Sequence, residues 1–345
     1  MMTRDGIRAT MLRTQDELQS IAADWRELYA RCPDATPFQS PEWLLSWIEV
    51  FAPRVLRVVE VREDDRLVGL APLLIYPRDS QQVLAFAGGG ASDYLNLLLE
   101  PGNEIELFRR VCAALENEGG WDVLELTDLA ANSRFTNLPE LKAFRVEHDV
   151  CSVTLLPSSR EALLQLFSDR QRANLRNAQS RLRREGGGEV QLATDETLRE
   201  FLEDLFVLHT SRWSTRGEPG VLASEQVRRF HLLASPRLLG SGQLCLYRLR
   251  VSGRTAAVIY ALFARETVYC YLQGFNPELS FFSPGTLLMF SVMEAAVRRG
   301  MRRFDLLRGQ ETYKRHWRPQ PEPTFRMAVP RACIVKLFAE HVQAA

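Results

Sequence analysis

The two halves of this chain carry the same predicted order of elements, and this repetition limits what the chain can fold into more than any other feature. In each half, runs rich in β-branched residues are separated by short turns, and a helix and one more strand follow them. The expected strands of the first half are 55–61, 67–76, 83–87, 94–99, 123–127 and 151–156, with a helix over 103–118. Those of the second half are 190–193, 243–251, 256–263, 268–275 and 303–307, with a helix that begins at Ser283-Pro284. We predict two copies of one α/β module, each a mixed, mainly antiparallel sheet flanked by helices.

The length and the charge distribution agree with a division into two parts. A chain of 345 residues is long enough for two domains, and we place them at residues 1–156 and 157–345. The 43 basic residues balance the 43 acidic ones, which argues against a dedicated nucleic-acid-binding protein and against a polybasic membrane protein. The balance is an average, because residues 1–150 carry 15 basic and 25 acidic side chains while residues 151–345 carry 28 and 18. We therefore expect an anionic ligand, if there is one, in the second half.

The cysteines and the hydropathy pattern predict a cytoplasmic protein without a metal site. The six cysteines form no Cys-x-x-Cys pair and have no zinc-ligand spacing to histidine. They are typical of reduced thiols, most of them buried. No apolar stretch approaches the length of a membrane span, and the first residues lack the apolar core of a signal peptide.

Six further helices are predicted, of which the last two cover about 196–212 and 224–234. One begins at the capping box Thr14-Gln-Asp-Glu17 and ends at about residue 31, and a second begins at Ser40-Pro41. A third is expected over about 133–143. A fourth begins at the capping box Ser158-Ser-Arg-Glu161 and continues to 184, with arginines on both sides of its apolar stripe. Its arginine stems are expected to cover the rim of the packing face, and the alternative is contact with a polyanion such as tRNA.

The start of the helix at Ser283-Pro284 is a candidate anion site. Ser283 is a good cap residue, and Pro284 has no amide to leave unsatisfied at the first helical position. The amides of Gly285, Thr286 and Leu287 then point out of the helix at the positive end of its dipole. A phosphate or pyrophosphate group can bind there, although an ordinary capped helix has the same pattern.

The segment after the next strand carries a recognisable pattern. It reads Asp305-x3-Gly309-x3-Tyr313-Lys314-x2-Trp317, and together with the preceding Ser-Pro-Gly helix start it resembles the C-terminal signature of CelD/BcsL-type proteins. These are cellulose-biosynthesis-protein-like members of the GNAT acetyltransferase superfamily, and they are similar to the Fem-type aminoacyl transferases. Three other segments resemble the same family: Pro37-Phe-Gln-Ser-Pro-Glu-Trp43, Ser92-Asp93-Tyr94 and Leu208-His209-x2-Arg212-Trp213. The resemblance covers about residues 35 to 330.

The resemblance implies a tandem GNAT fold and a transferase. An acetyl or other acyl group would pass from acyl-CoA, as co-substrate and without a metal, to an amine or a hydroxyl, with a sugar or exopolysaccharide precursor as the acceptor. The first module would lie on the acceptor side and the second would bind acyl-CoA. The usual pyrophosphate loop Arg/Gln-x-x-Gly-x-Gly/Ala is replaced by Phe281-Phe-Ser-Pro-Gly285-Thr, which keeps the helix-start amides and loses one glycine. Two alternatives remain, a Fem-like transferase that takes its donor from aminoacyl-tRNA and a non-catalytic accessory protein of polysaccharide biosynthesis.

The resemblance also implies residue roles in the second module. The strand 268–275 would offer a backbone amide and an edge for the pantetheine near Gln273 and Gly274. Lys314 would bind a phosphate or carboxylate or stabilise an oxyanion, and Tyr313 would give a proton to the departing thiolate. The alternatives are a solvated surface lysine and an aromatic side chain packed on the sheet edge.

The acceptor would be bound and deprotonated by residues from several segments. Asp93 is a candidate base or amine ligand, with an ordinary turn aspartate as the alternative. Asp305 is expected to hold the loop that follows its strand. The remaining candidates for the acceptor pocket, which can also be packing residues, are Tyr94, His209, Arg212, Trp213 and Glu311.

Overall fold

A computed structural model describes residues 6–214 and 217–334, and these form two compact units. Unit 1 contains the chain up to Asp149 together with the segment from Pro323 onward, and unit 2 contains Val150–Glu322. The chain therefore enters and leaves unit 2 through strands β9 (Arg145–Leu155) and β15 (Gln320–Pro330), which each belong partly to both units. Residues 323–330, which the sequence analysis assigned to the second module, fall in unit 1 because Thr324–Pro330 pair with β8 (Val123–Ala130).

Unit 1 contains two sheets. The first is antiparallel with the order β1-β3-β4-β7, formed by β1 (Ile7–Leu12), β3 (Val58–Glu63), β4 (Arg66–Ala71) and β7 (Leu98–Leu99). The second has the order β15-β8-β6-β5-β2, with β2 (Val55–Leu56), β5 (Leu73–Arg78) and β6 (Gln81–Phe86). β6 and β8 are parallel and are joined by helix α4 (Glu104–Glu118), the predicted crossover. The other helices of unit 1 are α1 (Gln15–Ser20), α2 (Ala22–Arg31), η1 (Pro37–Gln39), α3 (Pro41–Phe51) and η2 (Pro139–Phe144).

Unit 2 contains six neighbouring strands of a mixed sheet, in the order β10-β11-β12-β13-β14-β9. The predicted three-strand meander is present as β11 (Leu244–Val251), β12 (Arg254–Ala264) and β13 (Thr267–Phe275). β14 (Arg303–Arg308) runs parallel to β13 after a crossover through α9 (Pro284–Arg298), and β10 (Gly188–Leu192) is the edge strand. Both units therefore contain the predicted parallel pair joined by a helix, which confirms the mixed α/β fold class.

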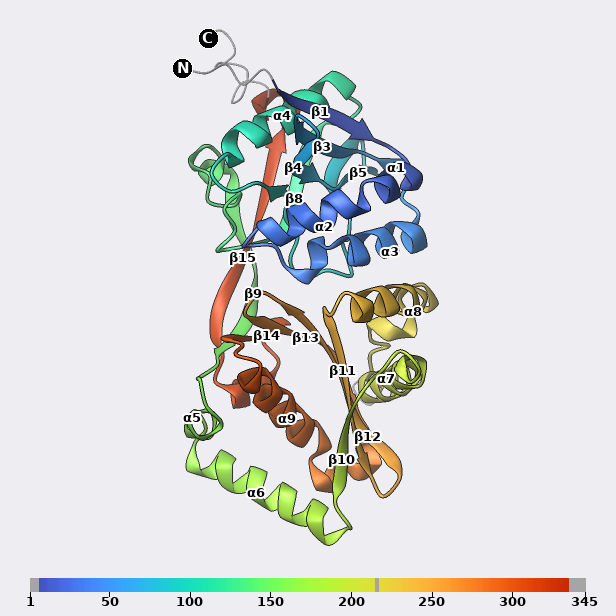
Figure 1. The fold of residues 1–345 in the computed structure, drawn as a ribbon, viewed down its shortest axis with the longest axis vertical. Coiled ribbons are helices and arrows are strands. Elements are labelled where there is room, and N and C mark those ends of the chain that lie inside the picture. The colour runs from blue at the N-terminus through green and yellow to red at the C-terminus, as the bar shows by residue number, and fades with distance from the viewer. Residues whose placement is uncertain (1–5, 215–216, 335–345) are drawn as a thin grey trace. The chain divides into compact units, whose positions relative to one another are not determined.

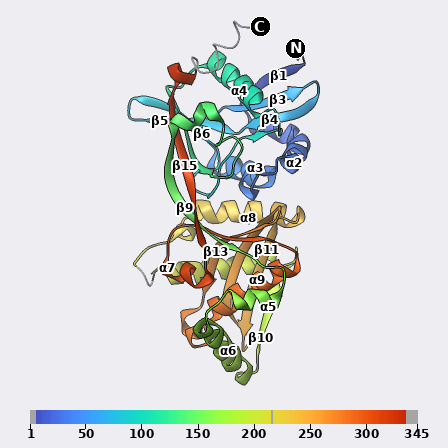
Figure 2. The same ribbon diagram turned by 90° about the vertical axis from the view of Figure 1, so that its left-hand side faces the viewer.

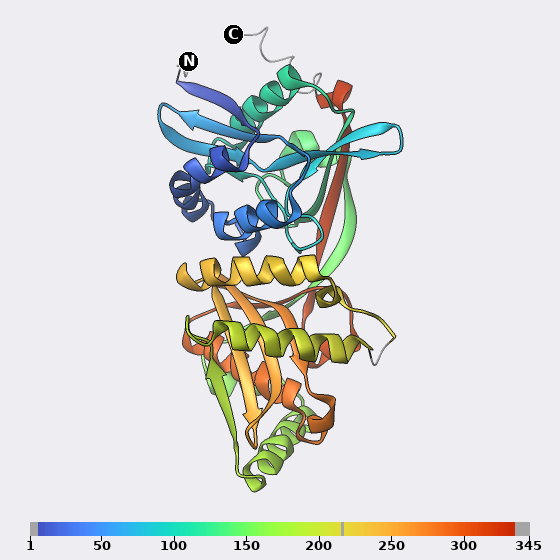
Figure 3. The same cartoon turned by 90° about the vertical axis from the view of Figure 1, so that its right-hand side faces the viewer.

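Helices cover both faces of the unit 2 sheet. α7 (Leu198–Ser214) and α8 (Glu225–Gly240) lie side by side on one face, and α9 lies on the other (Figures 1 and 3). α5 (Arg160–Gln165) and α6 (Asp169–Arg184) pack on the α9 side (Figure 2). Three short 3-10 helices complete the unit: η3 (Val221–Ala223), η4 (Pro277–Phe282) and η5 (Thr312–Trp317).

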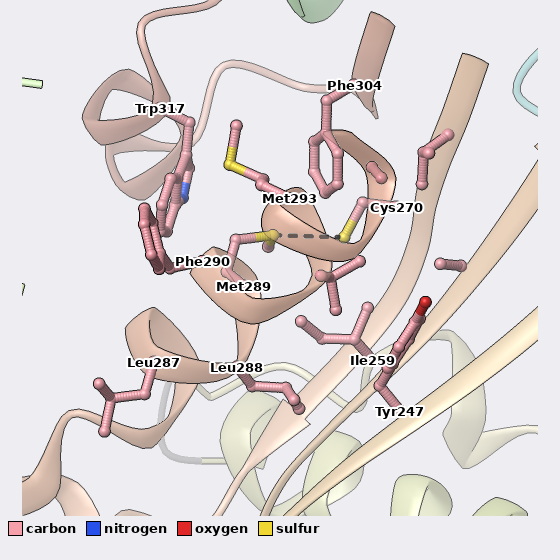
Figure 4. Packing of buried hydrophobic residues seen from close by; sticks show 14 of the residues in the cluster. Tyr247, Ile259, Cys270, Leu287, Leu288, Met289, Phe290, Met293, Phe304 and Trp317 are labelled. Atoms are coloured by element: carbon pink, nitrogen blue, oxygen red, sulfur yellow. Dashed lines mark hydrogen bonds between the residues drawn. The ribbon is translucent and has the colours of Figure 1, made fainter. Parts of the chain in front are cut away.

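The core of unit 2 forms where α9 packs on the strands. Leu288, Met289 and Met293 recur at helical spacing on the buried face of α9 and are at most 1% exposed. They contact the apolar face of the sheet, where the Cys270 thiol lies 3.8 Å from the Met289 sulfur and Phe304 of β14 is fully buried (Figure 4). Five of the six cysteines are buried, as predicted.

Several predicted helices and strands are shorter or divided in the structure. The helix expected over 15–31 is broken at Ile21, whose backbone leaves the helical region at φ −96° and ψ 5°. The helix expected over 133–143 is reduced to η2, because a residue that precedes proline, here Leu138, disfavours the helical conformation. The strand expected over 67–76 is divided at Pro72, and the strand expected over 94–99 is reduced to β7.

The arginine-rich helix is divided as well. Ser168 caps a new helix by accepting from the amide of Gln171 and forms a capping box with it, so the chain breaks between α5 and α6. The cap of α5 is Ser159, one residue later than predicted. The predicted caps at Thr14 and Ser40 are confirmed, since each side chain accepts from the amide three residues on. None of the described helices is both long and apolar enough to cross a membrane.

Candidate active site in unit 2

Strands β13 and β14 separate just after they begin to pair. Their parallel ladder covers only Thr267–Tyr269 against Arg303–Asp305. Beyond it Tyr271 is an extra residue in the pairing of β13 with β12, and β14 shifts register against β9 between Asp305 and Arg308. Bulges bend strands and increase their twist, so two bulges at the same level open a V between two neighbouring strands.

The separation leaves one edge of β13 without a strand partner in the described chain. The amide of Asn276 donates to the carbonyl of Ala256 on β12 at 2.9 Å. Because N–H groups alternate in direction along an antiparallel strand, those of Gln273 and Phe275 point away from β12, toward the open edge. The side chains of Gln273 and Phe275 also lie on the α9 side of the sheet, since a Cβ added at Gly274 would face α7. This edge offers backbone donors to a bound molecule.

The start of α9 lies at the end of the same strand. The amide of Leu287 donates to the carbonyl of Ser283 at 3.1 Å, so of the three predicted anion-binding amides only those of Gly285 and Thr286 have no intrahelical partner. Ser283 does not cap the helix with its side chain, contrary to the prediction, because its backbone is left-handed at φ 53°. Its hydroxyl instead accepts a hydrogen bond from Arg181 of α6 at 3.3 Å.

A cavity of about 500 Å³ lies between α6, the first turns of α9 and the end of β13. Its apolar wall includes an aromatic cluster in which Phe167 lies 6.1 Å from Phe290 and 5.8 Å from Trp317, measured between ring centroids. Its polar wall includes the carboxamides of α6. The lining residues with polar side chains are Gln171, Asn174, Asn177, Arg181, Arg212, Gln273, Ser283, Thr286, Tyr313 and His316.

Three predicted site residues meet at this cavity although they are far apart in the sequence. The Gln273 side chain donates to the Tyr313 hydroxyl at 2.6 Å. The Arg212 guanidinium, from the last turns of α7, lies 5.1 Å from the Tyr313 ring centre and 5.4 Å from that of Phe275. Cation–π contacts of this kind hold the Arg212 side chain beside the place where β13 and β14 separate.

The surroundings of Tyr313 keep its hydroxyl protonated. Burial raises the pKa of Tyr313, and the neighbouring Cys270 and Glu311 raise it further, while Arg212 acts in the opposite direction. Because Gln273 is the donor in their hydrogen bond, the Tyr313 proton can be given to another group. Tyr313 can therefore act as an acid in the cavity.

Lys314 points away from the cavity, although it is next to Tyr313 in the sequence. Its side chain is 3% exposed, and its ammonium group donates to the carbonyls of Leu307, Arg308 and Gly309. It also forms an ion pair with Glu311 at 2.9 Å. These contacts use all its donors, so the structure places Lys314 and Glu311 in the loop that supports Tyr313, outside the cavity lining.

Gly274 and His209 lie in a packing contact between β13 and α7, and Trp213 lies on the same helix as His209. A Cβ atom at Gly274 would come within 2.7 Å of the His209 amide nitrogen and 2.8 Å of Leu208, so glycine is required for α7 to approach the strand. His209 is 3% exposed, and its ring lies 5.9 Å from that of Trp213. Neither aromatic residue lines the cavity, and Gly274 faces the opposite side of the sheet.

Asp93 and Tyr94 belong to unit 1. Their loop contacts the segment Pro37–Trp43, because the Trp43 indole donates to the Ser92 hydroxyl at 2.9 Å and the Gln39 side-chain carboxamide donates to the Tyr94 carbonyl at 2.8 Å. The structure thus brings together two segments that carry the family resemblance. Asp93 is half-buried and Tyr94 is buried, and their assignment to the acceptor site stays a prediction.

Other residues of the cavity were missed by the sequence analysis. Arg181 and Asn174 lie on the arginine-rich helix, whose arginine stems the sequence predicts to cover the rim of its packing face. His316 lies inside the Tyr-Lys-x2-Trp pattern but was given no role. A pattern of carboxamides and arginine on one stripe of α6 was the available signal, and only the fold shows that this stripe faces α9. Among the described residues, no group of three or more His, Cys, Asp or Glu side chains is placed to hold a metal ion.

Comparisons with known proteins agree with this geometry. Residues 169–315, from α6 to η5, match the family model of the acetyltransferase (GNAT) domain. The structure is similar to that of FemX, at 13% identity and a TM-score of 0.67 over 96% of this chain and 99% of that one. It is similar to a conserved protein of unknown function from Bacteroides thetaiotaomicron VPI-5482, at 14% identity and a TM-score of 0.61 over 93% and 100%.

A third similar structure is the C-terminal domain of a putative lysylphosphatidylglycerol synthetase from Agrobacterium fabrum, at 13% identity and a TM-score of 0.56 over 92% of both chains. No curated protein sequence matches significantly. At these identities the structural neighbours establish a shared fold. The domain match covers the elements that build the cavity, so the segment 169–315 is similar to the acetyltransferase (GNAT) domain, and the chain shares a fold with FemX.

Proposed function

We propose that unit 2 transfers an acyl group from acyl-CoA to an amine or hydroxyl acceptor. One observation carries this proposal. Within the segment that matches the GNAT domain, the open edge of β13, the unpartnered amides of α9 and the protonated Tyr313 hydroxyl meet at one cavity. Each of the three is a group that acyl transfer from a thioester needs.

The residues present fit a CoA ester. The amides of Gly285 and Thr286, at the positive end of α9, suit the pyrophosphate, and Arg181 lies beside them through its contact with Ser283. The open edge of β13 suits an arm that contains amide groups, since backbone donors there have no strand partner. The aromatic wall suits the apolar part of the ester.

The protein side chains and amides then supply the chemistry. The acceptor forms a bond to the thioester carbonyl carbon while the carbon–sulfur bond breaks. An amide of β13, at Gln273 or Phe275, stabilises the negative charge that develops on the carbonyl oxygen. Tyr313 gives its proton to the departing thiolate, and His316, a proton acceptor in the lining, takes one from the acceptor.

The first test is calorimetry with acetyl-CoA on two variants of one position. Gly285→Glu places a negative charge at the helix start and should abolish binding. Gly285→Ala is the matched control for folding, because its Cβ would lie 3.8 Å from Phe275, which is ordinary contact. If the wild-type protein binds no CoA ester, or if Gly285→Glu binds as well as wild type, the proposed donor site is wrong.

The second test is Tyr313→Phe. Loss of the proton donor should lower kcat about a hundredfold, a size typical of general acid catalysis, and should leave the affinity for CoA unchanged. Steady-state kinetics with an amine acceptor and calorimetry with CoA measure the two quantities separately. Equal kcat in both proteins would remove Tyr313 from the mechanism.

Similarity to FemX supports a second candidate, the Fem-like transferase that takes an aminoacyl group from tRNA. Retention of charged tRNA without any binding of CoA esters would favour it. The CelD/BcsL-type resemblance supports a saccharide precursor as the acceptor. Binding of neither donor would favour the non-catalytic accessory protein.

A further inference from the structure

A second hollow of about 460 Å³ adjoins the main cavity at the start of α6. Gln171, Asn174 and His316 line both, so the two spaces are neighbours. The rest of the second hollow is lined by Ser168, Arg170, Arg315 and Arg318. We call it the basic pocket.

The basic pocket concentrates positive charge without a counter-charge. Its lining contains three arginines and no carboxylate. Within residues 6–214 and 217–334, none of Arg170, Arg315 and Arg318 takes part in an ion pair. Asp169, the nearest acid in the sequence, pairs with Arg172 instead. The three arginines are exposed and line one hollow from α6 and the end of η5, where a bound anion would reduce the repulsion between their charges.

The position of the basic pocket separates it from the proposed donor phosphate site. Arg170 and Arg181 are eleven residues apart on α6, which is about 16 Å along the helix axis. Arg181 contacts Ser283 at the start of α9, whereas Gln171, next to Arg170, donates to the His316 carbonyl at 2.8 Å. α6 therefore spans the cavity from the α9 amides at one end to the basic pocket at the other.

Resting on the proposed function, we infer that the acceptor carries a phosphate group and that Arg170, Arg315 and Arg318 bind it. Guanidinium groups match phosphate oxygens in pairs, and three of them suit a doubly charged phosphate or a diphosphate. The α6 start adds its positive dipole end beside them. The acceptor would enter from the end of the cavity opposite to the donor phosphate, with its nucleophile directed toward Tyr313.

The experiment titrates inorganic pyrophosphate, as the probe, into the full-length protein saturated with CoA. Calorimetry should detect pyrophosphate binding to the wild-type protein. The affinity should fall about tenfold, the loss expected for one charge-assisted contact, in each of three variants: Arg170→Gln, Arg315→Gln and Arg318→Gln. The matched control is Arg176→Gln, an exposed arginine of α6 outside both linings, which should bind as wild type. Absence of pyrophosphate binding, or equal losses in the control, would overturn the inference.

Two further measurements distinguish an acceptor phosphate from the 3′-phosphate of the donor, and distinguish failure of this inference from failure of the proposed function. If the basic pocket held the 3′-phosphate of the donor instead, Arg315→Gln would weaken the binding of CoA and leave the binding of dephospho-CoA unchanged. This result would overturn the assignment to the acceptor. Gly285→Glu should lose CoA and keep pyrophosphate binding that depends on Arg315. If the wild-type protein binds no CoA but still binds pyrophosphate through Arg315, the proposed donor is wrong and the basic pocket remains a phosphate site.

Discussion

Tyr313 and Lys314 are neighbours in the sequence, yet their side chains serve opposite sides of η5. Successive residues of a 3-10 helix point about 120° apart, so one can face the cavity while the next faces the interior. Tyr313 reaches Gln273, and Lys314 reaches three carbonyls at the end of β14. The buried ammonium group thus holds the loop from which Tyr313 extends.

Lys314→Met should therefore act mainly on stability. Methionine keeps much of the volume but leaves the carbonyls of Leu307, Arg308 and Gly309 without a donor, so the free energy of unfolding should fall by about 3 kcal/mol. Chemical denaturation of the variant and the wild type measures this difference. Unchanged stability with lost acyl transfer would instead support the catalytic role that the sequence suggested for Lys314.

At the scale of elements, two glycines near the cavity have different reasons to be glycine. Gly274 lets α7 approach β13, since the nearest atoms to a Cβ there are backbone atoms that cannot move independently. Gly285 has room for a Cβ, and in the proposed function its lack of a side chain lets the ligand reach the α9 amides. Packing requires the first, and ligand binding the second.

Gly274→Ala should lower the free energy of unfolding by about 2 kcal/mol, because the added methyl group forces α7 away from the sheet. Gly285→Ala should change it by no more than about 0.5 kcal/mol. Thermal denaturation of both variants, compared with the wild type, tests the contrast. Similar losses in the two would mean that the α7 contact does not limit position 274.

For the whole molecule, two buried histidines should make folding sensitive to acid. Burial lowers the pKa of His231 to about 3 and that of His209 to about 4, against an ordinary value of 6.5. His231 is fully buried among the rings of Phe230, Tyr260 and Tyr271. Below pH 6.5 the unfolded chain binds protons that the folded protein does not, so stability falls as the pH drops from 6.5 toward 4.

His231→Phe should reduce that dependence. At pH 5 the histidine costs the wild type about 1 to 2 kcal/mol relative to pH 8, and the variant is spared this loss. Urea denaturation at pH 5, 6.5 and 8 gives the free energy of unfolding of both proteins as a function of pH. The two proteins should differ in the slope of this dependence below pH 7 and have the same slope above it. Parallel curves throughout would show that His231 does not titrate on unfolding.

By itself, the sequence determined the features that depend on neighbours within a few residues. The caps at Thr14 and Ser40, the meander from β11 to β13 and the start of α9 at Pro284 follow from hydrogen bonds and periodicity inside short segments. Tertiary structure decided the rest. Residues 324–330 pair with β8, the stripe of α6 faces α9, and Lys314 turns inward, because each depends on packing between segments that lie far apart in the chain.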